Sequence, residues 1–147
     1  MSDHIMRLVA LTTFGAVLLA AGAASSGDKP TSAGQALNCD IHKGACRQTV
    51  EEHTVALDIS PKPVTAMTEL TFQVTVSGTP LSNPPHIDLG MPGMQMGPNR
   101  VEMTKTGDRA YEGKGVIVRC PSGKRVWQAT VTLPETGKAE FVFDVVY

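Results

Sequence analysis

Apolar and polar residues alternate along short stretches of this chain, and this alternation constrains the fold more than any other feature. Leu70, Phe72, Val74 and Val76 alternate with threonine and glutamine, the pattern of a strand with one buried face. The same period recurs over residues 55–59, 87–89, 101–103, 111–118, 127–133 and 141–147. Because no stretch after the first two dozen residues has a helical period, the sequence predicts an all-β fold.

Turn-forming residues separate these stretches at 61–63, 77–80, 106–108, 121–123 and 134–137. About seven short antiparallel strands at such spacing predict an immunoglobulin-like β-sandwich over residues 37–147. A small closed barrel is the competing architecture. Residues 45–50 are a candidate for one further strand, with a hairpin turn through Glu51 and Glu52.

The N-terminal residues 1–24 have the pattern of an export signal. One arginine precedes an apolar run over residues 8–20, and small residues then offer a cleavage site near Ala23 or Ala24. The run is shorter than the roughly 20 apolar residues of a spanning helix, which favours cleavage over an uncleaved anchor. Residues 25–36 are small and polar and are predicted to form a flexible tether. We therefore expect a periplasmic or secreted protein without a stable membrane span.

Charge and motif content argue against two broad classes of function. The 147 residues carry 13 Lys+Arg against 14 Asp+Glu, a net charge of -1, with no basic stripe for nucleic acid. There is no nucleophile elbow, phosphate-binding loop or spaced histidine pair, and Glu51 and Glu52 are adjacent on a turn. We expect neither nucleic-acid binding nor catalysis.

A methionine-rich motif is the feature that points to a specific chemistry. Met91, Met94 and Met96 fall within six positions between glycines and prolines, with His86 five residues ahead. Thioethers are soft, neutral ligands that suit Cu(I), and an added imidazole would extend the site to Cu(II). Methionine is also a common core filler, but a loop is rarely buried. The predicted metal ligands are therefore Met91, Met94, Met96 and His86, with copper as Cu(I) the expected cofactor.

Strand counting predicts where this loop lies. If successive strands are antiparallel, the connections over residues 60–69, 90–98 and 120–125 emerge at one end of the sandwich. Met67 and Cys120 would then share that end with the methionine motif, although Met67 and Met103 are expected to serve as core or rim residues. Period-2 spacing places Met94 and Met96 on one face, which suits either a shared ligand or packing onto the core.

Three cysteines leave several pairings open. Thiols tend to pair in an oxidising compartment, and an odd count leaves one free or paired with another molecule. The sequence favours one intramolecular disulfide, either between Cys39 and Cys46 or between one of them and Cys120. Two less favoured alternatives are a zinc-like set of the three cysteines with His42 and a redox pair of Cys39 and Cys46, whose spacing differs from C-x-x-C.

From Glu69 to its last residue the chain resembles the YtkA-like family, which is related to the periplasmic part of FixH-like proteins. The resemblance is carried by residues 71–74, 91–97, 111–115 and 126–131. It implies an exported or membrane-attached immunoglobulin-like domain that is associated with copper handling in cytochrome-oxidase or efflux contexts. The family motif carries over to Met91, Met94 and Met96, whereas the segment from Cys39 to Cys46 and Cys120 are additions whose role the family does not supply.

Two functions follow as hypotheses. In the first, the protein is an exported copper-binding or copper-delivery protein whose partners are a copper ion and a cell-envelope copper protein or an oxidase-assembly or efflux component. In the second, it is a non-metal immunoglobulin-like interaction module that docks onto a cell-envelope complex through the same apolar loop. Convergence of the sulfur and imidazole groups on one spot would favour copper, and methionines turned into the core would favour docking.

Overall fold

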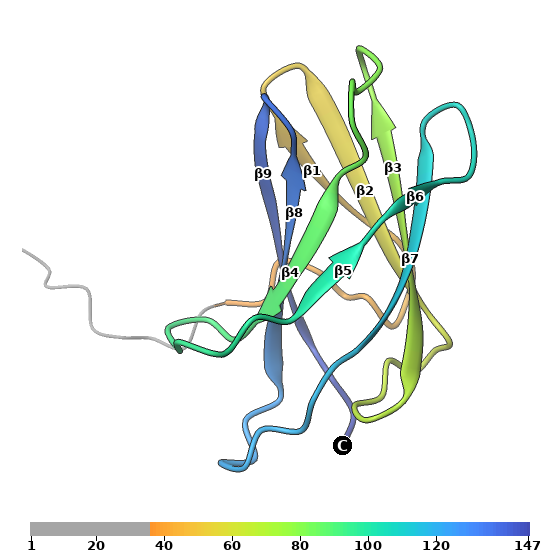
Figure 1. Cartoon of the computed structure of the whole chain (residues 1–147). Coiled ribbons are helices and arrows are strands. Elements are labelled where there is room, and N and C mark those ends of the chain that lie inside the picture. Colours follow the sequence, from red (N-terminus) through yellow and green to blue (C-terminus); the bar gives the residue numbers. More distant parts are fainter. Residues whose placement is uncertain (1–35) are drawn as a thin grey trace, which may run out of the picture. The chain divides into compact units, whose positions relative to one another are not determined.

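Figure 1 shows the protein as a computed structural model in which residues 36–147 are described. The predicted signal over residues 1–24 and the predicted tether over 25–36, Ala36 excepted, lie outside the described residues. Residues 36–147 belong to one compact unit, which contains the hydrophobic core. Within residues 36–147 no helix is long and apolar enough to cross a membrane.

Residues 36–147 form nine strands in two antiparallel sheets, which confirms the predicted all-β sandwich. The five-stranded sheet has the order β1 (Cys46–Val50), β2 (His53–Ser60), β3 (Glu69–Ser77), β7 (Ala110–Val116) and β6 (Thr104–Lys105). The four-stranded sheet has the order β5 (Arg100–Glu102), β4 (His86–Gly90), β8 (Val126–Leu133) and β9 (Gly137–Asp144). The candidate strand over 45–50 is present as β1, and β6 is a strand that the alternation did not indicate.

The core lies between the two sheets and is built from the inward positions of the alternating strands. In β3 the predicted residues Leu70, Phe72, Val74 and Val76 are buried. On the facing sheet Trp127 of β8 and Phe141 and Phe143 of β9 are fully buried, and with Phe72 of β3 they are the largest such side chains. The period-2 pattern thus identifies the buried face correctly, because one face of each sheet is covered by the other sheet.

The segment over residues 36–45, which we call the strap, covers the outer edge of β9. Asn38 and Cys39 donate their backbone N–H groups to the carbonyl of Val142 at 3.1 and 3.2 Å. A disulfide between Cys39 and Cys46 ties the strap to β1, which settles the pairing that the sequence left open. Covering an edge strand in this way removes a template for unwanted strand pairing.

His42 fixes the other end of the strap. Its Nδ1 accepts the backbone N–H of Val64 at 3.2 Å, so the neutral ring carries its proton on Nε2, which donates to the carbonyl of Asp144 at 3.0 Å. One imidazole therefore joins the strap, the β2–β3 connection and β9. Both ring nitrogens of His42 are occupied by this structural role.

The strand connections separate into two groups at opposite ends of the sandwich (Figure 1). One end, which we call the methionine end, is formed by the loops over residues 61–68, 91–99 and 117–125. The far end is formed by the loops over residues 51–52, 78–85, 106–109 and 134–136. The antiparallel alternation that the sequence predicted therefore places the methionine motif, Met67 and Cys120 at the same end.

Candidate metal site at the methionine end

A tight turn joins the first two methionines of the motif. The backbone N–H of Met94 donates to the carbonyl of Met91 at 3.1 Å, with Pro92 and Gly93 in the central positions. Gly93 has a φ of 71°, which matches the third position of a type II turn, where a side chain would be strained. The sequence Met-Pro-Gly-Met encodes this turn directly, because proline suits the second position and glycine the third.

The three methionines differ in exposure. Met91 is only 5% exposed and belongs to the core cluster, whereas Met94 is 41% exposed. Met96 is partly buried and packs against the core. The motif therefore combines one core side chain, one surface side chain and one of intermediate position, rather than three equally exposed thioethers.

Met91 and Met94 line one open depression of about 260 Å³ on the outer face of the four-stranded sheet. Its polar walls are the side chains of Asp88 on β4 and of Gln128 and Thr130 on β8. A Cβ added at Gly90 would meet no atom within 4 Å. The missing side chain at this glycine therefore leaves space beside the turn.

Asp88, the acidic group of the depression, is already paired. Its carboxylate accepts from Nε of Arg100 at 2.8 Å and lies 3.4 Å from Nε2 of His86. The hydrogen bond with Asp88 raises the pKa of the Arg100 guanidinium above its ordinary value. The charge of Asp88 is therefore compensated by Arg100, and Met91 and Met94 are the sulfur-containing residues that line the depression.

His86 is not brought to the methionine loop. It opens β4, whereas Met91 follows the last residue of that strand, so their Cα atoms are about 16 Å apart at the rise of an extended chain. The side chain of His86 lies beside Asp88 and opposite Glu102 and Thr132. An extended strand between the two therefore separates groups that are close in sequence.

The other two methionines of the described part also lie outside the depression. Met67 is 66% exposed in the loop over residues 61–68, and its backbone N–H donates to the carbonyl of Ile117 at 2.8 Å. Met103 is buried between β5 and β6. These positions agree with the expectation that they serve as rim and core residues.

Cys120 is the free cysteine of the chain, and it is buried. Its thiol lies 3.0 Å from the hydroxyl of Ser122. That side-chain hydrogen bond, followed by the backbone N–H of Ser122, lowers the pKa of the Cys120 thiol below its ordinary value. A zinc-like set with Cys39, His42 and Cys46 is excluded, because the disulfide uses two of its sulfurs.

Among residues 36–147 no group of three or more histidine, cysteine, aspartate or glutamate side chains is arranged to hold a metal ion. Sequence reasoning did not identify Asp88, Gln128 and Thr130 as neighbours of the motif. Their outward positions on β4 and β8 follow from the alternation, but the register that sets them beside Met91 does not. Comparisons with protein-family models, with curated proteins and with solved structures find no match to this chain.

Proposed function

We propose that this protein is an exported copper-binding or copper-delivery protein that holds Cu(I) at the methionine loop. Met91 and Met94 are the central ligands, and Met96 completes the set from the same loop. The observation that supports this most is the type II turn, which puts Met91 and Met94 on the wall of one open depression. Thioether ligands in an accessible, shallow site favour Cu(I) and favour its transfer.

The separation of His86 from the loop refines the ligand set. Without an imidazole the site consists of neutral sulfur ligands, which hold Cu(I) and have little affinity for Cu(II). The exposed thioether of Met94 is the group through which an acceptor would first meet the ion. A cell-envelope copper protein, or an oxidase-assembly or efflux component, is the kind of acceptor that the YtkA-like resemblance implies.

Export is part of the same proposal. The disulfide between Cys39 and Cys46 fits an oxidising compartment such as the periplasm or the exterior, because thiols in the cytosol are kept reduced. The signal pattern of residues 1–24 points the same way.

An anaerobic Cu(I) titration against a chromogenic competing chelator tests this function. The parent is expected to bind one equivalent, and a Met91→Leu, Met94→Leu, Met96→Leu variant to lose it, because leucine keeps the volume but removes the sulfur. A Met67→Leu, Met103→Leu variant is the matched control and should bind like the parent. Equal binding by the parent and the triple variant would overturn the proposal.

A second candidate is the non-metal interaction module, which docks onto an envelope complex through the methionine loop. It is favoured by the burial of Met91 in the core, since that thioether already has a packing role. The exposed Met94 would then be a contact residue rather than a ligand. Absence of Cu(I) binding by the correctly folded parent would favour this function.

A further inference from the structure

Exposed apolar side chains are concentrated at the methionine end. The described residues include six exposed large hydrophobic side chains: Leu37, Met67, Met94, Val116, Val118 and Val146. Met94 belongs to the methionine loop. Four others form what we call the valine patch, which consists of Met67, Val116, Val118 and Val146.

Backbone hydrogen bonds hold the segments of the valine patch side by side. The N–H of Met67 donates to the carbonyl of Ile117 at 2.8 Å, and the N–H of Ala66 donates to the carbonyl of Val146 at 2.9 Å. Ile117 is fully buried, so its neighbours Val116 and Val118 point outward by strand alternation. The patch therefore combines the end of β7, two adjoining loops and the segment that follows β9, and none of its residues lines the depression.

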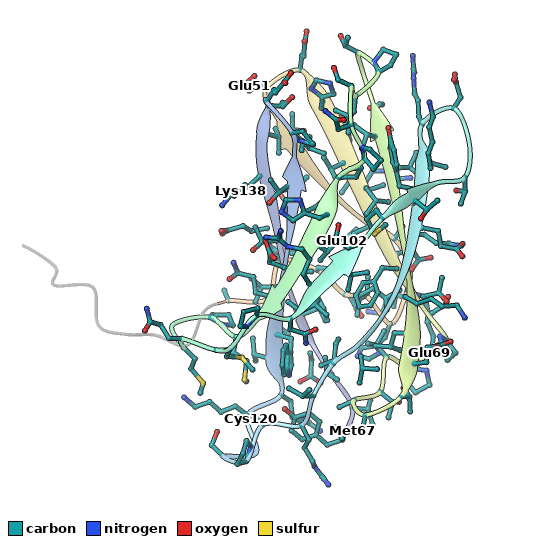
Figure 2. All side chains as sticks on the ribbon, in the orientation of Figure 1. Glu51, Met67, Glu69, Glu102, Cys120 and Lys138 are labelled. Atoms are coloured by element: carbon teal, nitrogen blue, oxygen red, sulfur yellow. A yellow bond between two sulfur atoms is a disulfide. The ribbon has the colours of Figure 1, made fainter. Side chains whose placement is uncertain are left out.

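A cationic loop adjoins this patch. Arg119, Lys124 and Arg125 are all exposed, and residues 117–125 contain no carboxylate. The loop is anchored by Tyr147, whose hydroxyl accepts from the backbone N–H of Cys120 at 3.0 Å. The guanidinium of Arg119 lies 5.2 Å from the centre of the Tyr147 ring. Figure 2 shows Cys120 and Met67 labelled at the same end of the domain.

Charge divides between the two ends of the sandwich. The loops at the methionine end carry Lys62, Arg119, Lys124 and Arg125 and no carboxylate. The loops at the far end carry four carboxylates and one cation, namely Glu51, Glu52, Asp108, Glu135 and Arg109, and Figure 2 places Glu51 at that end. A field of this polarity turns the methionine end toward an anionic surface.

We propose that the valine patch and the cationic loop form a docking face for an anionic lipid surface. Aliphatic side chains that stand among cations can enter the headgroup layer while lysine and arginine meet the phosphates. Two strand carboxylates lie near this face, and both are paired with cations: Asp144 of β9 lies 3.7 Å from Arg125, and Glu69 of β3 lies 2.8 Å from Lys114. The lipid contact does not require a metal, and it uses residues that do not line the depression.

Co-sedimentation with sucrose-loaded vesicles in metal-free, low-salt buffer tests this docking. The protein is the chain from Ser32 onward, which contains every core residue of the described part and lacks the apolar N-terminal run that would itself enter lipid. Vesicles contain either phosphatidylcholine alone or two parts phosphatidylcholine to one part phosphatidylglycerol. Binding is expected to the second vesicle and to fall as salt is added.

Two variants separate the contributions. Arg119→Gln, Lys124→Gln, Arg125→Gln is expected to weaken binding about tenfold or more, because each cation near an anionic membrane contributes several-fold. Met67→Ser, Val118→Ser should weaken it through lost apolar insertion. Lys105→Gln, Arg109→Gln, Lys138→Gln changes the charge equally at sites away from the patch and should bind like the parent.

Three results would overturn the docking proposal. They are no preference for the anionic vesicle, equal loss in the control variant, or parental binding by both patch variants. A face that instead recognises an acidic protein would give the first of these results. Thermal unfolding of each variant checks that the sandwich is intact, so lost binding is assigned to the surface.

Discussion

The surroundings of the Cys120 thiol lower its pKa. The turn from Cys120 to Gly123 is closed by the N–H of Gly123, which donates to the Cys120 carbonyl at 2.9 Å. This turn brings the hydroxyl of Ser122 to 3.0 Å from the sulfur, and the hydrogen bond lowers the thiol pKa. The positive charge of Lys124 acts in the same direction.

Replacing Ser122 with alanine is therefore expected to raise the pKa of Cys120. The thiolate would then form at higher pH, and the midpoint of the alkylation rate against pH would shift upward. Cys39 and Cys46 do not react because they are oxidised, so iodoacetamide labelling followed by mass spectrometry reports Cys120 alone. Ser77→Ala removes a hydroxyl elsewhere and should leave the midpoint unchanged. An unaltered midpoint in Ser122→Ala would show that the serine does not stabilise the thiolate.

The sequence predicted that one cysteine would lie outside an intramolecular disulfide, but not which one. An odd number of cysteines requires it, whereas the choice depends on how the strap folds back. Here the strap runs along β9 through Asn38 and Cys39 before it reaches β1. That path rests on contacts more than 100 positions apart in sequence, such as Asn38 with Val142, and no local pattern encodes them.

At the scale of elements, two glycines in β7 allow a close approach between the sheets. A Cβ at Gly113 would lie 2.8 Å from Cγ1 of Val101 and 2.9 Å from Sδ of Met103, and would overlap the Glu102 carbonyl. A Cβ at Gly115 would lie 2.6 Å from Cγ2 of Val101. These glycines make room where the chain passes from β5 in one sheet to β6 in the other.

Gly113→Ala is accordingly expected to lower the free energy of unfolding by about 1–3 kcal/mol, since the backbone of Glu102 must move. Urea unfolding followed by tryptophan fluorescence measures this change, because Trp127 is the chain's one tryptophan and is fully buried. Gly97→Ala is the control, as a Cβ there meets nothing within 4 Å, and its stability should change by less than about 1 kcal/mol. Equal stability of the two variants would contradict this packing account.

The alternation predicted most strands because each has one covered face. It indicated β3 and β8 well, where every second residue is buried. It did not indicate β6, because Thr104 and Lys105 are both exposed and two residues cannot show a period. It placed the last strand over 141–147, whereas β9 is Gly137–Asp144, because Val145 and Tyr147 continue the alternation beyond Asp144, where the pairing with β8 ends.

At the scale of the whole molecule, the sandwich places the methionine motif, the valine patch and the cationic loop at one end, which the composition does not indicate. The net charge of -1 gives no sign that cations and carboxylates lie in loops at opposite ends. Counting antiparallel strands did predict which loops share an end. It could not predict that the depression lies beside β4 and β8, because that depends on strand order.

The sequence predicted only part of the candidate site, because some of its geometry is local and the rest depends on strand pairing. The turn from Met91 to Met94 is local and is encoded by its own residues. The burial of Met91 and the distance to His86 depend on the length and register of β4 against β8, from His86–Thr132 to Gly90–Gln128. A sequence window places His86 near the motif, whereas an extended strand of about 3.3 Å per residue carries it away.

The most direct test of a Cu(I) site is to watch the methionine methyl groups as the metal is added. A carbon–proton correlation spectrum of protein with ¹³C-methyl methionine resolves each thioether, and the Met→Leu variants assign them. On anaerobic addition of one equivalent of Cu(I), we expect the methyl signals of Met91, Met94 and Met96 to shift while those of Met67 and Met103 stay in place. Uniform small shifts, or shifts at Met67 and Met103 alone, would contradict a copper site at the methionine loop.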